Sequence, residues 1–116
     1  MSYYSKNILS QISFAPDAPV SVYFGDPYPG DGYYGKSDGL HTFQYSVTNL
    51  EGTLVIQATL VFEPTESDWS TVYSKEYELI EESANHIQNI VGNYVWVRAG
   101  VIDWKHGSIN VIRMKH

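Results

Sequence analysis

The residues of this sequence that are best suited to bind a ligand lie within residues 25–39, a segment rich in Gly, Pro, Asp and Tyr. Its rings and carboxylates belong to Tyr28, Tyr33, Tyr34, Asp26, Asp31 and Asp38. A planar ring can stack on the C–H face of a sugar while carboxylate oxygens accept hydrogen bonds from the hydroxyls, so this mixture suits carbohydrate recognition. The same tyrosines could contact a protein partner or pack the segment onto the domain. Composition leaves all three roles open, and contact with a protein is the one we favour.

Metal binding is the second chemistry that these aspartates suggest. Carboxylates in a Gly-rich segment suit Ca²⁺, but the spacing of Asp26, Asp31 and Asp38 differs from that of an EF-hand loop. Asp beside Gly or Pro is also ordinary turn chemistry, because its side chain bonds nearby backbone amides. The histidines are far apart in the sequence and are expected at surface or loop positions: His41, His86, His106 and His116. We therefore expect neither a metal nor any other cofactor.

Trp96 and Arg98 form another candidate binding pair, because they are two residues apart on a strand predicted over residues 94–101 and share one of its faces. If this face is exposed, the pair would form a partner-binding surface together with Tyr94. If it is buried, Arg98 would stack on Trp96 or Trp104. The sequence does not separate these two arrangements.

The polar stretch of residues 63–69 contains three carboxylates and ends in Trp69. One helical turn here would place Trp69 as a lid over the edge of the core. Glycoside hydrolysis needs two carboxyl groups at a defined separation, one of them a buried acid, whereas short polar loops bring groups such as Glu63, Glu66 and Asp68 together routinely. The sequence has no Gly-x-Ser-x-Gly motif, no phosphate-binding or dinucleotide-binding fingerprint and no cysteine. We therefore expect that the protein is not an enzyme.

The overall composition limits the partners of the chain. Its 116 residues include 13 acidic and 7 basic residues, and its net charge is −6 with neutral histidines. A chain this acidic lacks the basic surface that nucleic acid or an anionic membrane requires. No apolar run is long enough to span a bilayer and no N-terminal signal is evident, so we expect synthesis in a cytoplasm. The length favours a single domain over residues 1–116, with residues 1–14 as an N-terminal arm.

The candidate residues must be positioned by β-strands, because runs of β-branched and aromatic residues alternate with turn signals along most of the chain. The clearest pattern predicts a β-hairpin in which residues 42–47 and 54–62 flank a turn at residues 49–52. On its second strand the expected core face consists of Leu54, Ile56, Ala58, Leu60 and Phe62. Further strands are expected at residues 8–14, 20–24, 72–80, 94–101 and 109–114, with a turn at residues 103–108 before the last; residues 81–90 fit a short helical piece or a long connection. Six to eight short strands predict an all-β fold, a small antiparallel β-sandwich of jelly-roll-like type.

A series of short motifs follows in order along the chain. They lie at residues 30–35 (Gly-Asp-Gly-Tyr-Tyr-Gly), 37–42, 52–53, 56–60, 63–69 (Glu-Pro-Thr-Glu-Ser-Asp-Trp), 92–99 and 107–109. This order resembles small β-sandwich virion proteins of tailed bacteriophages, particularly marine phages of cyanobacteria. The resemblance covers roughly residues 30–112. It implies a non-enzymatic structural protein of the virion, such as a capsid decoration protein or a tail, neck or baseplate component, made in the host cytoplasm. It also implies contacts with other virion proteins and brings no catalytic residues.

The alternative function is a carbohydrate-binding or host-receptor-binding module. For either function we expect the binding residues to be Tyr28, Tyr33, Tyr34, Asp31, Trp69, Trp96 and Arg98. Aromatic residues make up 15% of the chain, which predicts a homo-oligomer with residues 25–39 or the N-terminal arm at an interface.

Overall fold

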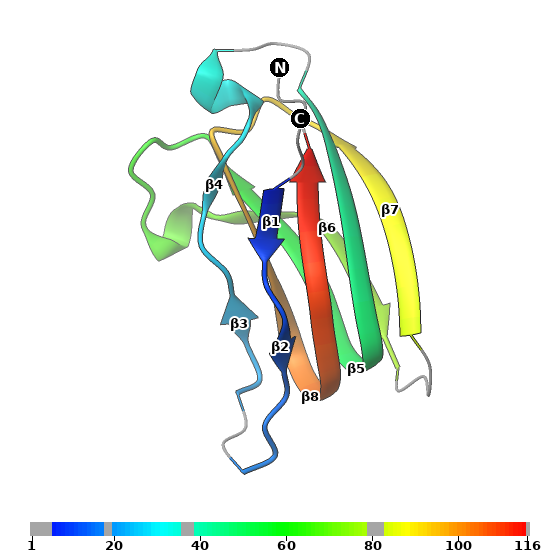
Figure 1. Cartoon of the computed structure of the whole chain (residues 1–116). Coiled ribbons are helices and arrows are strands. Elements are labelled where there is room, and N and C mark those ends of the chain that lie inside the picture. The colour runs from blue at the N-terminus through cyan, green and yellow to red at the C-terminus, as the bar shows by residue number, and fades with distance from the viewer. Residues whose placement is uncertain (1–5, 18–19, 36–38, 79–82, 116) are drawn as a thin grey trace.

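The computed structural model describes residues 6–17, 20–35, 39–78 and 83–115, and within them it contains β-strands and short 3₁₀ turns but no α-helix. The elements are β1 (Lys6–Leu9), β2 (Ile12–Ser13), β3 (Tyr23–Phe24), β4 (Tyr28–Pro29), η1 (Asp31–Tyr34), β5 (Leu40–Thr59), η2 (Glu66–Asp68), β6 (Ser70–Tyr77), β7 (Ser83–Val91) and β8 (Trp96–Lys115). Figure 1 shows their arrangement. All strand pairs are antiparallel, so the expected all-β antiparallel fold is confirmed.

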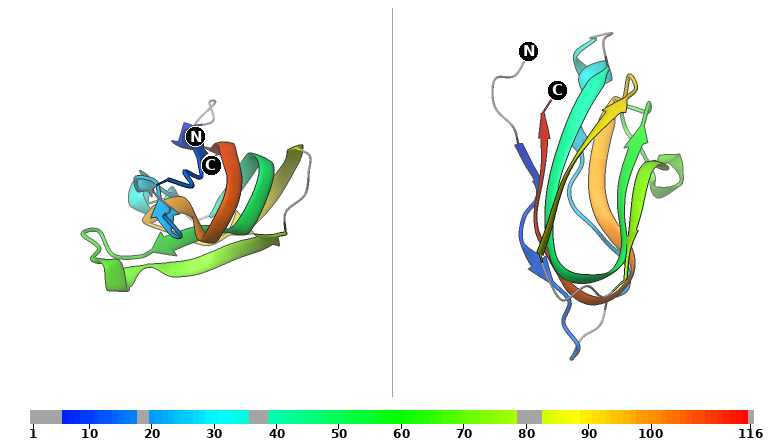
Figure 2. Two further views of the ribbon diagram at one scale, coloured as in Figure 1. Left: turned by 90° about the horizontal axis from the view of Figure 1, so that it is seen from below. Right: turned by 90° about the vertical axis from the view of Figure 1, so that its right-hand side faces the viewer.

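The sandwich is one sheet folded onto itself. The long strands β5 and β8 pair from Thr42 opposite Lys115 to Thr59 opposite Trp96. Both strands bend near their middles, so that each contributes one half to each layer (Figure 2). The first layer consists of residues 40–48 of β5 and 108–115 of β8, together with β1, β2 and β7. The second layer consists of residues 51–59 of β5 and 96–106 of β8, together with β3, β4 and β6.

Residues with positive φ angles produce these bends. Asn49 and Asp103 both have φ of 50°, Gly52 has 156° and Gly107 has 88°. The pairing of β5 with β8 also shifts register between Thr48 and Glu51, which is the irregularity expected where a sheet folds over. A Cβ atom at Gly107 would collide with the backbone carbonyl of Asn49, so the two bends pack directly against each other.

The hairpin predicted from residues 42–47 and 54–62 is wrong. These residues belong to the two halves of β5, which lie in different layers and do not pair with each other. The segment at residues 49–52 does reverse the chain direction, but as a corner in one strand. Both halves find their partners elsewhere in the sequence, on β6, β7 and β8, and this pairing satisfies their backbone groups. The turn expected at residues 103–108 is the equivalent corner of β8.

Apolar side chains from both layers meet between them. Leu54, Ile56 and Ala58 are buried there, as expected. Leu60 and Phe62 were expected on the same face, and this is wrong, because they are 70% and 58% exposed. The partners of β5 end with Trp96 opposite Thr59 and Ser70 opposite Ala58, so the chain leaves the sheet before Leu60.

A second error concerns residues 81–90, which were expected to form a helical piece or a connection. Residues 83–91 form β7 instead, paired with β5 from Leu40 opposite Val91 to Thr48 opposite Ser83. Asn, Gln and His occur on both faces of this strand and hide its two-residue period. The local sequence only weakly favours a strand here, and the backbone hydrogen bonds to residues 40–48 of β5 stabilise it.

The strands expected near the N-terminus lie at the expected positions in the sequence but differ in length. The strand expected at residues 8–14 is divided into β1 and β2, and the one expected at residues 20–24 is reduced to β3. Residues 6–13 of the expected N-terminal arm therefore pair with β8. The single helical turn before Trp69 is confirmed as η2. No helix in the described ranges is long and apolar enough to cross a membrane.

Candidate binding site

Arg98 lies on the outer face of the second layer, and its guanidinium is held between two aromatic rings. The carbon Cζ lies 4.2 Å from the ring centre of Phe24 and 4.4 Å from that of Trp69. Gly100 makes room for this stack, because a Cβ atom there would collide with the Phe24 ring. Trp69 therefore covers Arg98 rather than the edge of the core.

The guanidinium is also satisfied by hydrogen bonds. Its Nε and Nη2 donate to Gln57 Oε1 at 3.0 and 2.8 Å, and its Nη1 and Nη2 donate to the two carboxylate oxygens of Glu66 at 3.0 and 3.1 Å. The hydrogen bonds and positive charge of Arg98 lower the pKa of the Glu66 carboxyl, which is largely exposed. Arg98 itself is only 7% exposed. Arg98 is therefore buried, but the expected stacking on Trp96 or Trp104 is wrong, because Phe24 and Trp69 are its partners. Through this stack Arg98 anchors the η2 loop to the sheet.

Four aromatic side chains form an exposed cluster next to this anchor, and we call it the aromatic platform: Tyr33, Tyr34, Phe62 and Trp96. The ring centre of Tyr33 lies 5.2 Å from that of Tyr34, 5.6 Å from that of Phe62 and 5.0 Å from that of Trp96. Tyr33, Tyr34 and Phe62 are 41%, 52% and 58% exposed. Trp96 is half-buried, and its Nε1 donates to the carbonyl of Phe62 at 2.9 Å. Rings from three separate segments thus meet on one surface.

A hollow open to solvent lies beside the platform. It is lined by Pro27, Phe62, Pro64 and Trp96. Proline and aromatic rings expose flat apolar faces without flexible side chains, so a ligand docking here would restrict few rotamers.

Backbone contacts fix η1, which carries Tyr33 and Tyr34, to the two residues that precede β8. Gly30 N–H donates to Val95 O at 2.9 Å, and Gly32 N–H donates to Tyr94 O at 2.8 Å. The carbonyl of Tyr94 leaves no space for a Cβ atom at either glycine. The chain can approach this closely only because both positions are glycine.

His41 completes this support, and its expected surface position is wrong because its side chain is fully buried. Its Nδ1 bonds the carbonyl of Gly39 at 2.9 Å, and its Nε2 accepts from the backbone N–H of Asp31 at 3.1 Å. A neutral imidazole with the proton on Nδ1 makes both bonds. In the sequence, Phe43 and Tyr45 alternate with polar residues, and His41 is in step with them. This two-residue alternation was the signal that could have predicted the burial of His41.

The structure brings the residues predicted from the sequence together in two groups: Tyr33, Tyr34 and Trp96 on the platform, and Arg98 with Trp69 in the stack beside it. Tyr28 lies on β4 and packs against the core, and Asp31 is only 1% exposed, so neither lies on the platform surface. Sequence reasoning missed Phe62 because it assigned this residue to the core face. Within the described ranges, no group of three His, Asp or Glu side chains could hold a metal ion; Asp38, considered above for calcium, lies outside these ranges.

Together these features define a small β-sandwich domain with an exposed aromatic surface. No family model matches the sequence, and no curated protein matches it. Among solved structures, the chain is similar to the K2 cleaved adhesin domain of Lys-gingipain, with a TM-score of 0.62 and 7% identity over 91% of this chain and 70% of that one. At this identity the similarity supports the fold alone. A Clostridium thermocellum xylanase 10B structure, containing CBM22-1 and GH10 modules in complex with xylohexaose, matches 99% of this chain and 29% of that one at 12% identity and a TM-score of 0.41, too low to bear on function.

Proposed function

We propose that this protein is a non-catalytic binding module whose aromatic platform stacks against the sugar rings of a glycan. The observation that carries the proposal is the contact of Tyr33 with Tyr34, Phe62 and Trp96 on an exposed surface. Rings held in place by one another and by a backbone-anchored loop lose little freedom when a ligand binds. The similarity in fold to a domain described as an adhesin is compatible with this proposal.

The carboxylates near the platform support a non-catalytic role. Glu66 is paired with Arg98, which lowers its pKa, whereas a general acid needs a raised one. The carboxylate of Asp68 accepts hydrogen bonds from the backbone N–H and the hydroxyl of Thr65, as part of the capping box of η2. Both carboxyl groups thus have structural partners.

Glycan binding is tested with the substitutions Tyr34→Ala and Phe62→Ala. Loss of one stacking ring should weaken binding to a responsive polysaccharide by about tenfold. Val22→Ala is the control, because it also removes exposed apolar surface, while its neighbours Ser21 and Tyr23 pair with Trp104 and Val101, far along β8 from Trp96. A panel of neutral and acidic polysaccharides, measured by affinity electrophoresis, supplies the ligands. Unchanged affinity in both platform variants would overturn the proposal.

A second candidate is a structural protein of a tailed-phage virion, a capsid decoration or a tail, neck or baseplate accessory. The observation that favours it is the exposed apolar run Leu60, Val61 and Phe62, at 70%, 41% and 58%, next to the platform. This is more apolar surface than stacking on a sugar requires, and it suits contact with another virion protein or a second copy. Sedimentation of the wild type and of Leu60→Ser tests this candidate. Concentration-dependent assembly that Leu60→Ser abolishes would favour it, and a monomer at all concentrations would count against the homo-oligomer.

A further inference from the structure

Charge is unevenly distributed between the two layers. The strands of the first layer contain Lys6, Arg113 and Lys115 but no Asp or Glu, so all 13 acidic residues lie elsewhere in the sequence. None of these three basic residues forms an ion pair with a described residue. Arg113 and Lys115 lie on the outer face of this layer, whereas Lys6 pairs with the buried Met114 and so belongs to the other face. The outer face is therefore locally basic although the chain is acidic, and such a face attracts anionic groups.

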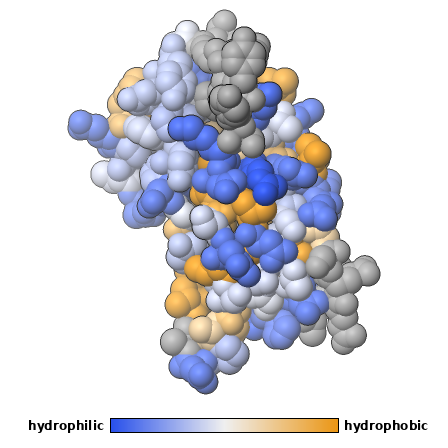
Figure 3. Space-filling view, viewed as in Figure 1, coloured by the Kyte–Doolittle hydropathy of each residue, from blue (hydrophilic) through white to orange (hydrophobic). Residues whose placement is uncertain are grey.

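The other side chains on this face are neutral; most are polar, but Leu40, Ile87 and Val91 are apolar and 46%, 60% and 71% exposed. Register places Ile87, Gln44 and Arg113 in one row across β7, β5 and β8, and Asn89, Thr42 and Lys115 in the next row. Consecutive rows on the same face are about 7 Å apart. Thr42 Oγ1 donates to Asn89 Oδ1 at 2.8 Å, which orders the second row. Figure 3 shows this side of the molecule, where hydrophilic and hydrophobic residues alternate.

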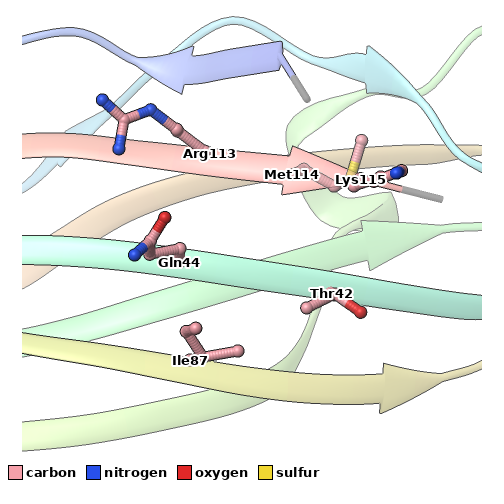
Figure 4. A pocket seen from close by; sticks show the side chains of 6 residues that line it. All are labelled: Thr42, Gln44, Ile87, Arg113, Met114 and Lys115. Carbon is pink, nitrogen blue, oxygen red and sulfur yellow. The ribbon is translucent and has the colours of Figure 1, made fainter. Parts of the chain in front are cut away.

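A hollow lies over these two rows. It is lined by Thr42, Gln44, Ile87, Arg113, Met114 and Lys115, and Figure 4 shows their side chains on the three neighbouring strands. Ile87 is 60% exposed and offers an apolar surface at one end of its row, while Arg113 supplies a charged fork at the other end. Gln44 lies between them with an amide that can both donate and accept.

We propose that this hollow binds a carboxylate or sulfate group of an acidic polysaccharide. Arg113 pairs with the anionic group, Lys115 in the next row attracts a neighbouring one, Gln44 bonds a hydroxyl, and the C–H face of the sugar lies on Ile87. The proposal rests on the glycan-binding function proposed above and adds a ligand class and a second site. Nucleic acid is a poorer fit, because its dense phosphates need more than the two cations of this face and would meet the acidic remainder of the chain.

The test compares two double variants that lower the net charge equally. Arg113→Gln with Lys115→Gln removes the proposed contacts. Lys75→Gln with Lys105→Gln is the control, because both lysines lie in the second layer, and Lys105 lines a hollow with Glu51, Glu76, Glu78 and Asp103. Affinity electrophoresis is run with heparin as the sulfated probe, polygalacturonate as the carboxylated probe and dextran as the neutral one.

We expect the wild type to bind at least one acidic probe, with an affinity that falls as salt is added. The Arg113/Lys115 variant should lose about tenfold or more of this affinity, and the control less than about twofold. Preference for heparin or for polygalacturonate distinguishes sulfate from carboxylate. The proposal would be overturned if both double variants lost affinity equally. It would also be overturned if the wild type bound neither acidic probe, or bound dextran as well as the acidic probes. If Tyr34→Ala and Phe62→Ala leave all binding unchanged while the Arg113/Lys115 variant loses it, the platform proposal fails and the anion site stands.

Discussion

The guanidinium of Arg98 lies 4.4 Å from the ring centre of Trp69 and joins the loop after β5 to the outer face of the second layer. Phe24 covers the other side of the same guanidinium, so one side chain connects β3, β8 and the η2 loop. That loop also carries Phe62, so the buried Arg98 helps to hold this ring of the platform in position.

Replacing Arg98 with Ala is expected to lower the free energy of unfolding by about 2–3 kcal/mol, because it empties the space between two rings and removes four hydrogen bonds. Urea unfolding followed by tryptophan fluorescence measures the change. Arg113→Ala is the control, since Arg113 is exposed and its loss should cost less than about 0.5 kcal/mol. Equal destabilisation by the two substitutions would contradict the role assigned to the stack.

The Arg98–Glu66 ion pair should make stability depend on pH in the acidic range. The pKa of Glu66 is lowered in the folded protein, so the stability from its charge is fully present above the ordinary glutamate value of 4.5 and is lost as the pH falls through the folded pKa. The difference in urea midpoint between wild type and Glu66→Gln should therefore be constant from neutral pH down to about 5 and shrink below that. Glu63→Gln provides the control in the same loop. A difference that grows on acidification would contradict the assignment.

The corner of β8 at Gly107 should tolerate no side chain. Gly107→Ala places a Cβ atom at a φ of 88° and against the carbonyl of Asn49, so we expect a loss of more than about 2 kcal/mol in the free energy of unfolding. Gly35→Ala is the matched control, because its φ of 73° is similar but nothing lies within 4 Å of the added atom. It should cost about 1 kcal/mol from backbone strain alone. Similar losses for both variants would mean that the two corners do not pack against each other.

His41 should control the position of η1 without contacting a ligand. His41→Leu removes the acceptor of the Asp31 N–H and leaves that buried donor without this partner, at a cost of about 1–3 kcal/mol. Hydrogen exchange of the Asp31 and Tyr33 amides should accelerate in this variant. Thr48→Leu changes the same strand at a position away from η1 and should leave the exchange of these amides unchanged. Unaltered exchange in His41→Leu would show that the glycine contacts with Tyr94 and Val95 are sufficient.

The sequence by itself determined the all-β class, the buried face of Leu54, Ile56 and Ala58, and the candidate rings Tyr33, Tyr34 and Trp96. Two-residue alternation and turn chemistry are local properties, so they can be read along the chain. Only the tertiary structure decided that residues 42–59 form one folded strand rather than a hairpin, that residues 83–91 form β7, and that Phe62 is exposed while Arg98 and His41 are buried. Each of these outcomes depends on which distant segment supplies the partner, because backbone pairing and aromatic stacking join residues tens of positions apart.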